Sequence, residues 1–445
     1  MESVEDIHKR IAELSSAIDL QLDVLKSLEK RRSVARRTLN SRLDPMARLP
    51  VEIASEIFIR CTPDSPSPVF TEEPLKFLHV CQLWRRIAVS CPSLWASIQL
   101  KQLGPDLDPD FLKTCWDWLG RARALPLSLS LHEGVHYLLS GWLKHFGRQI
   151  AHMELRLSEE SQVYGVRTQG PFPLLQTMKI QYLKEDPADS ESETSDDTDD
   201  PSSFYFISSS IAMLLAAPLL VECTFDSVRY LYANDHLRQG GSRMTHTSLR
   251  HLRLGTPSPG SHSSNSAGIL LGLNLPALET LHLTDLDISP EDLTSFFAAS
   301  GSPSSLQALH MSISRFENAE WRLSTQLLNS CFRPLGALRT LELFHGLEID
   351  YIALLSVMRA QDFLPHLQHL PIHGRFGTPQ HWKLVLETML ARGVGTERSL
   401  RSVKVISTVV PKKTDLPVEV LERMRELVKE EGMSIYVGSI STNFV

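Results

Sequence analysis

Residues 278–283 read LETLHL, and residues 306–311 read LQALHM. Both have the form L-x-x-L-x-L, whose last two apolar residues stand two positions apart, as on one face of a β-strand. The chain holds nine such triads: Ile150/Met153/Leu155, Leu175/Met178/Ile180, Leu220/Cys223/Phe225, Leu249/Leu252/Leu254, Leu278/Leu281/Leu283, Leu306/Leu309/Met311, Leu338/Leu341/Leu343, Leu367/Leu370/Ile372 and Leu400/Val403/Val405. Successive triads lie 25, 45, 29, 29, 28, 32, 29 and 33 residues apart. The sequence therefore repeats with a period near thirty residues.

The one long step contains a polar insertion at residues 185–203, and removing those 19 residues shortens it from 45 to 26. Self-similarity at this period is typical of a solenoid, and L-x-x-L-x-L is the strand portion of a leucine-rich repeat. The usual asparagine ladder is missing, because Leu283 is followed by Thr284, Asp285 and Leu286. We therefore expect an α/β fold with an irregular leucine-rich-repeat-like solenoid over residues 98–445.

Helical patterns fall between the triads. Residues 290–299, 351–360 and 379–392 are expected to form the outer layer of the repeats. Before the array, the pattern predicts a helix over 111–122, a strand over 125–131 and a helix over 140–146. After it, residues 418–431 are expected to form a terminal helix that caps the solenoid.

Side chains beside the inward leucines should point to the concave face, where the partner of a solenoid usually binds. Each of them on its own also fits a solvated surface residue. As a set they predict a target-binding surface that consists of Lys179, Arg253, His282, His310, Glu342 and Lys404.

The N-terminal segment of residues 1–43 has a heptad pattern over residues 4–39 that predicts one long amphipathic helix. A second copy of the chain could bury its apolar stripe in a coiled coil, or the helix could fold back on the body of the protein. Gln21 and Arg32 interrupt the stripe, whose apolar members are Val4, Ile7, Ile11, Leu14, Ile18, Leu25, Leu28, Ala35 and Leu39. Asp44 and Pro45 should end this helix, because proline disfavours the α conformation in the residue before it.

Residues 49–61 read LPVEIASEIFIRC, and residues 72–98 read EEPLKFLHVCQLWRRIAVSCPSLWASI. The spacing of Ile53, Ile57 and Phe58 places one apolar stripe on a first helix. Helices this short cannot bury that much apolar surface among themselves. Some of these side chains are therefore expected to meet a partner protein or the following domain.

This segment resembles the F-box family, in the variant abundant in mushroom-forming fungi. The family's residues occur in the family's order, although the link between the first helix and Val80 is longer than usual. They are Leu49, Pro50, Glu52, Ile53, Ile57, Phe58, Val80, Cys81, Trp84, Pro92, Leu94 and Trp95. The resemblance covers about an eighth of the chain, and its specificity lies in the combined pattern.

The resemblance implies a three-helix domain over residues 44–97 that docks on a Skp-type linker and, through it, joins a cullin–RING ubiquitin ligase. Carried over position by position, it implies contact with the Skp surface, or a role in shaping it. For Ile57, Cys81 and Trp84, a place in the core of the helical unit is an equal alternative. The positions are Leu49, Pro50, Ile53, Ile57, Phe58, Val80, Cys81 and Trp84.

Residues 185–200 read EDPADSESETSDDTDD and hold no apolar residue able to anchor a core, which predicts a disordered loop. Ser190 and Thr194 each have an acidic residue three positions on, which resembles acidophilic casein-kinase-type sites. A solubilising spacer is the alternative interpretation.

His132, Glu133 and His136 formally match H-E-x-x-H, in which two histidines one helical turn apart bind zinc and the glutamate activates water. The alternating leucines before His132 place it at a strand end, and Gly134 disfavours a helix. A zinc metalloprotease is therefore only a remote alternative, and we expect neither a catalytic residue nor a cofactor or metal site.

Composition narrows the remaining classes of function. A net charge of −7 and a pI of 6.2 disfavour a nucleic-acid partner. Six scattered cysteines without a C-x-x-C pair fit a reducing compartment, and neither a signal peptide nor a membrane span is expected.

The sequence thus predicts a cytoplasmic or nuclear, non-catalytic substrate adaptor of a ubiquitin ligase. A protein-interaction scaffold without ligase function is the alternative.

Overall fold

The computed structural model divides the chain into two compact units, one of residues 1–100 and 107–127, the other of residues 101–106 and 128–445. The residues described are 4–101, 109–132, 136–157, 171–182, 213–226, 243–255, 268–284, 290–301, 305–312, 330–344, 351–374, 376, 378–393, 400–407, 416–439 and 443–445. The insertion at 185–203, with Ser190 and Thr194, lies outside them.

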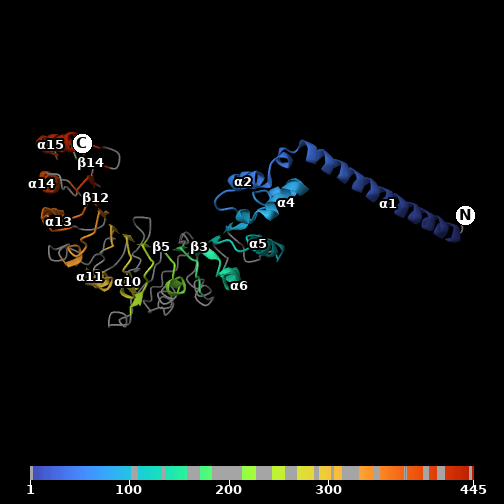
Figure 1. The fold of residues 1–445 in the computed structure, drawn as a ribbon, viewed down its shortest axis with the longest axis horizontal. Helices are drawn as coiled ribbons and strands as arrows, with labels where there is room; N and C mark the ends of the chain where they lie inside the picture. Colours follow the sequence, from blue (N-terminus) through green and yellow to red (C-terminus); the bar gives the residue numbers. More distant parts are fainter. Residues whose placement is uncertain are drawn as a thin grey trace. The chain divides into compact units, whose positions relative to one another are not determined.

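The first unit is mostly helical (Figure 1). Its elements are α1 (Val4–Leu43), the 3-10 helix η1 (Pro45–Arg48), α2 (Val51–Cys61), α3 (Phe77–Val80), α4 (Gln82–Ser90), the 3-10 helix η2 (Pro92–Trp95), strand β1 (Ser97–Leu100) and α5 (Pro109–Arg121). The predicted N-terminal helix is present as α1. It ends before Asp44, whose carboxylate accepts a hydrogen bond from the Met46 backbone N–H at 2.9 Å and caps η1.

Two aromatic clusters hold the first unit together. Phe58 of α2 stacks on Phe77 of α3 with ring centroids 4.3 Å apart, and Trp84 of α4 lies 5.0 Å from Phe58. In the second cluster the Trp95 and Trp118 rings meet edge to face at 5.2 Å. The indole N–H groups of Trp95 and Trp118 donate to the carbonyl oxygens of Ala88 and Ser97. Helix α5 therefore packs against η2 and β1 within the first unit.

The second unit is built on one long sheet (Figure 1). Its strands are β2 (Leu127–Leu131), β3 (Ile150–Leu157), β4 (Thr177–Tyr182), β5 (Glu222–Asp226), β7 (His251–Gly255), β9 (Thr280–Thr284), β10 (Ala308–Ser312), β11 (Thr340–Leu343), β12 (His369–Gly374), β13 (Ser402–Ser407) and β14 (Ser434–Gly438). They neighbour one another in this same order, and every pairing from β3 to β14 is parallel. The predicted α/β class is confirmed.

All nine triads contribute buried side chains to strands of this sheet. Each triad enters one strand from β3 to β13, and every triad side chain is at most 2% exposed. The sheet is therefore apolar on one face, which the helices cover, and the alternate residues of each strand face the other way.

A recurring pair of backbone hydrogen bonds joins each strand from β4 to β12 to its next neighbour in the sheet. The carbonyl oxygen of Arg250 accepts both the Glu279 and Thr280 N–H groups, at 2.8 and 2.9 Å, and that of Glu279 accepts two N–H groups from the start of β10. The same pattern recurs at the carbonyls of Gln176, Val221, Gln307, Arg339 and Gln368. Because it uses only main-chain groups, this carbonyl ladder can fix strand spacing without asparagine side chains.

The helices lie along one side of the sheet (Figure 1). They are α6 (His136–Phe146), α10 (Gly268–Leu271), α11 (Pro290–Ala299), α13 (Tyr351–Met358), α14 (Pro379–Gly393) and α15 (Val418–Glu431), with a separate two-stranded sheet of β6 (Met244–Thr245) and β8 (Leu273–Asn274). The hydrophobic pattern of the sequence predicted the bounds of α11, α14 and α15 to within about one residue at each end. Among the described residues, no helix is both long and apolar enough to cross a membrane.

Arg392 of α14 is a buried cation that links α14 to the end of α13 and the residues after it. Its guanidinium donates to the carbonyl oxygens of Leu364 at 2.8 Å and Ala360 at 2.9 Å, and also to those of Met358 and Phe363. Only 6% of the residue is exposed. It therefore satisfies carbonyl groups at and beyond the end of α13 that helix hydrogen bonds leave open.

We predict that Arg392→Met lowers the free energy of unfolding of the second unit by about 2–3 kcal/mol, because it leaves buried carbonyl groups without donors. Urea denaturation measures this change. Arg359→Met is the matched control: Arg359 is half exposed and its ion pair with Glu387 spans 3.0 Å, so its loss should change stability by no more than about 0.5 kcal/mol. Equal effects of the two variants would contradict the structural role of Arg392.

Candidate functional site

The open face of the parallel sheet carries a row of polar side chains. The strand register aligns Glu154 with Lys179, Lys179 with Thr224, and Thr224 with Arg253. It continues from Arg253 through His282 and His310 to Glu342, and it aligns Pro371 with Lys404. All six residues of the predicted target-binding surface belong to this row, which we call the polar row.

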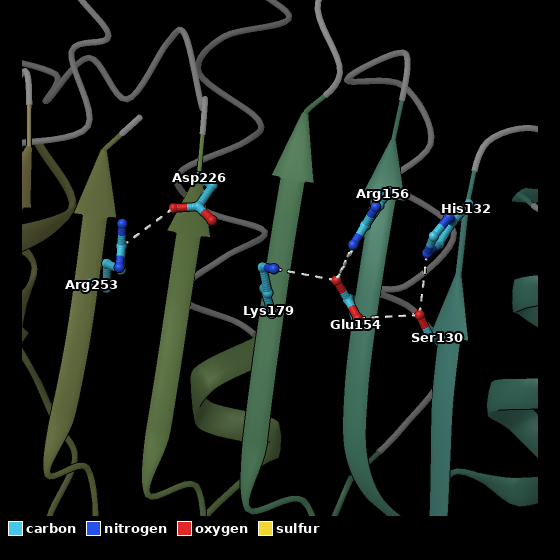
Figure 2. Close-up of polar contacts among 7 residues, drawn as sticks. All are labelled: Ser130, His132, Glu154, Arg156, Lys179, Asp226 and Arg253. Atoms are coloured by element: carbon cyan, nitrogen blue, oxygen red, sulfur yellow. Dashed lines mark hydrogen bonds and ion pairs between the residues drawn. The ribbon is translucent and has the colours of Figure 1, made fainter. Parts of the chain in front are cut away.

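Glu154 is the centre of a hydrogen-bond network at the N-terminal end of the row (Figure 2). Its Oε1 accepts from Arg156 at 3.1 Å and from Lys179 at 3.3 Å, while its Oε2 accepts from Ser130 at 3.2 Å. Burial by itself would raise the pKa of Glu154, but the hydrogen bonds and charges of Arg156 and Lys179 lower it below the usual value. The carboxylate is therefore ionised and holds both cations in place.

A second charged pair lies on the next strands. The Arg253 Nε is 3.7 Å from the Asp226 Oδ1 (Figure 2). Burial raises the pKa of Asp226, and the charges of Arg253 and Lys179 only partly oppose this shift. Arg253 itself is exposed, so its guanidinium keeps donors available to a bound partner.

Histidines and one glutamate make up the middle of the row. The His282 and His310 rings stack at 3.9 Å with an angle of 5° between their planes. The Glu342 Oε2 accepts a hydrogen bond from the His310 Nδ1 at 2.6 Å, and the Glu342 Oε1 lies 3.6 Å from the His373 Nε2. These contacts join four neighbouring strands through their side chains.

The charges in this cluster favour a neutral His282 beside an ionised Glu342. Burial, followed by the nearby His310 and Arg253, lowers the pKa of His282 to about 4. Burial would raise the pKa of Glu342, but hydrogen bonds and charge from His310 and His373 lower it to about 2. At neutral pH the cluster thus holds an ionised Glu342 close to a neutral His282 ring.

A shallow polar hollow of about 340 Å³ adjoins the row at the starts of β9 to β12. Its lining includes the residues two positions before the polar row, on the same face of the sheet. The hollow is lined by Glu279, Thr280, Gln307, Ala308, Arg339, Thr340, Gln368 and His369. The open face can therefore present many hydrogen-bonding groups to an extended partner.

The candidate Skp-binding positions divide into exposed and inner residues. Leu49, Pro50, Ile53, Ile57 and Val80 are exposed, and Ile53 reaches 50%. Ile53 and Ile57 are four residues apart on α2 and so share a face. In this single unit their apolar side chains remain open to solvent.

The other three candidate positions are buried or half-buried: Phe58, Cys81 and Trp84. Phe58 is 1% exposed and belongs to the aromatic core, so its contribution is to shape the surface from below. Cys81 and Trp84 are half-buried, and both reach Asp44: the Trp84 indole N–H donates to its Oδ2 at 2.8 Å, and the Cys81 thiol donates at 3.7 Å. Asp44 was expected from sequence only to end α1, yet it also fixes α4.

The long link between α2 and α3 is held by the rest of the unit. The Gln99 backbone N–H donates to the Pro66 carbonyl at 2.8 Å, and the Ser97 hydroxyl donates to the Asp64 carbonyl at 3.1 Å. After the link the chain forms two short helices, α3 and α4, divided by the extended residue Cys81. The extra length is thus accommodated beside β1.

The H-E-x-x-H motif lacks its helical geometry. His132 directly follows strand β2 and its Nε2 lies 3.3 Å from the Ser130 Oγ, whereas helix α6 begins at His136. Glu133 lies outside the described residues. Within the part of the chain that the structure describes, no three histidine, cysteine, aspartate or glutamate residues are placed to hold a metal ion.

Five polar residues that partner the predicted surface were not predicted from the sequence: Ser130, Glu154, Arg156, Asp226 and His373. Glu154 stands between the last two apolar residues of its triad, as Lys179 does, so the same rule would have found it. Arg156, Asp226 and His373 each directly follow a triad. Their inclusion would have required the strand to be extended past its last apolar residue.

Comparison of the chain with protein-family models and with curated proteins found no match.

We predict that stability falls as the pH is lowered from 6.5 to 4, partly because of His282. In that range the unfolded chain binds a proton at His282 that the folded protein does not, so protons favour unfolding. His282→Gln should lessen the fall by about 1–2 kcal/mol, since the half-buried ring is only partly screened. Urea denaturation at both pH values tests this. His366→Gln, at an exposed position, should leave the fall unchanged, and an unchanged fall in His282→Gln would refute the assignment.

Proposed function

We propose that this chain is the substrate-recognition adaptor of a Skp/cullin/F-box-type ubiquitin ligase. In this proposal the segment 44–97 is an F-box-like domain that binds the Skp-type linker. The second unit is an irregular leucine-rich-repeat-like solenoid that binds the target protein. The chain itself performs no catalytic step.

The observation that carries the proposal is the exposed aliphatic face of α2. Ile53 and Ile57 of α2, with Leu49 just before it, are between 37% and 50% exposed in a helical unit that already has its own aromatic core. They stand at the positions that the F-box resemblance assigns to the linker surface. Clustered apolar residues that a small unit leaves open are characteristic of protein interfaces.

The polar row supports the second half of the proposal. Nine buried triads and nine parallel strand pairings, with helices on one side, are the construction expected of leucine-rich repeats. The row offers cations at Arg253 and Lys404 and an anion at Glu342. Such alternation fits a folded or extended protein surface with charges of both signs better than a polyanion.

An adaptor of this kind accelerates ubiquitin transfer by holding the target near the charged conjugating enzyme. The gain comes from a raised effective concentration of target lysines, while the thioester chemistry belongs to another subunit. Neither unit then needs a catalytic residue. A zinc metalloprotease is disfavoured because His132 and His136 do not share a helical turn.

A scaffold that keeps this fold without binding the linker is the second candidate function. The exposed apolar stripe of α1 favours it, since that stripe offers an assembly surface outside the F-box-like segment. Binding of a purified Skp-type linker separates the two candidates. The scaffold requires that no such binding occurs.

We predict that the double variant Ile53→Asp/Ile57→Asp weakens binding to a Skp-type linker by about hundredfold or more, because it places charge in an apolar interface. Isothermal titration calorimetry of the full chain measures the affinity. Ile59→Asp makes the same chemical change on another face of α2 and should leave the affinity within about threefold. Thermal unfolding confirms that each variant folds. Tight binding by the double variant, or none by the unaltered chain, would exclude the ligase role.

We predict that Lys179→Glu/Arg253→Glu removes the target from the proteins labelled by proximity biotinylation, with a loss of about tenfold, because it reverses two charges of the polar row. Lys383→Glu/Lys429→Glu reverses two exposed charges on α14 and α15 and should leave the labelling unchanged. Skp labelling reports that each variant still joins its complex. If both variants lose the same proteins, the polar row is not the target-binding surface.

A further inference from the structure

Helix α1 leaves its apolar stripe uncovered along its whole length. The eight large apolar residues of the stripe are between 44% and 69% exposed: Val4, Ile7, Ile11, Leu14, Ile18, Leu25, Leu28 and Leu39. Leu22 and Val24, which flank the stripe at its centre, are each 47% exposed. A 40-residue helix that holds such a stripe in water is stabilised when another helix covers it.

The charges of α1 are divided between its two halves. Residues 4–23 hold five acidic and two basic residues, whereas residues 24–43 hold seven basic residues and only one acidic residue, Glu29. The N-terminal half therefore carries a net charge of −3 and the C-terminal half +6. Within one helix the two halves meet only at their boundary, where Lys26 lies 3.6 Å from Asp23, so the excess charge of each half is not neutralised by the other half.

Parallel pairing of two copies would bring like charges together. With Val4 at the a position of the heptad, Arg32 is also an a residue, so two Arg32 side chains would share one core layer. Arg31 at g would then face Arg36 at e of the other helix. Each of these contacts destabilises a parallel pair.

Antiparallel pairing removes these conflicts. Each acidic half then lies against the basic half of the other helix, and the two Arg32 side chains lie in different core layers. We propose that α1 forms an antiparallel coiled coil with α1 of a second copy of this chain. The inference goes beyond the ligase proposal and stands without it.

The antiparallel pair fixes the distance between the two points at which the chains leave the coiled coil. A helix of 40 residues at 1.5 Å per residue is about 60 Å long. The C-terminal ends of the two α1 helices, from which the remaining chain continues, then lie about 60 Å apart. The dimer presents two polar rows, so a target with two binding segments would be held by avidity.

Sedimentation of the full chain tests the dimer. We expect Ile18→Asn to weaken the dimer by at least about tenfold, since it places an amide in the apolar stripe, while Ser16→Asn on the outer face leaves it unchanged. Added salt should weaken the dimer, because it screens attraction between the halves. A monomer at all concentrations, a dimer insensitive to Ile18→Asn, or a dimer that salt strengthens would each overturn the proposal.

Cross-linking tests the orientation in a Cys61→Ser background, which removes an exposed thiol. Ile7→Cys and Leu39→Cys are made in separate proteins, mixed, and treated with a short bismaleimide. We expect a cross-linked dimer in the mixture and little in either protein alone, with the unsubstituted background as control. Cross-linking of Ile7→Cys alone as strong as in the mixture shows parallel pairing and overturns the proposal. So does capture of α1 by a different protein in place of a second copy.

Discussion

The structure of the second unit depends on one repeated constraint, in which a carbonyl oxygen just before one strand accepts two N–H groups at the start of the next. Together with the buried triads, this carbonyl ladder fixes both the spacing and the register of the parallel strands. Because the register is fixed, residues about thirty positions apart in sequence become neighbours on the open face. The stacked rings of His282 and His310 and the hydrogen bond from His310 to Glu342 follow directly from this alignment.

The first unit depends on a different constraint. Its aromatic clusters bury Phe58, Phe77 and Trp95, and so leave the aliphatic face of α2 without a partner inside the unit. The two units therefore present chemically different surfaces, one apolar and one polar. An apolar face suits a constant partner bound for long times, whereas a hydrogen-bonding face suits selection among targets. This difference in chemistry is the physical basis of the proposed adaptor.

Much of this structure could be predicted from the sequence, because period-2 and period-3.6 patterns report burial directly. Each of the nine triads corresponds to one strand, and Asp44 with Pro45 was correctly predicted to end the N-terminal helix. Strands β1 and β14 were missed because neither belongs to a triad. The role of Asp44 in holding Trp84, 40 residues away, and that of Arg392 in holding four carbonyls could not be predicted, because both arise from contacts that no local period encodes.

Hydrogen–deuterium exchange on the full chain, with and without a purified Skp-type linker, tests the proposed adaptor function most directly. The proposed division of surfaces predicts slower exchange at residues 49–58 and 80–84 in the complex, with unchanged exchange in β9 to β11. Protection that falls on the sheet strands, or no protection in α2 at saturating linker, would contradict it.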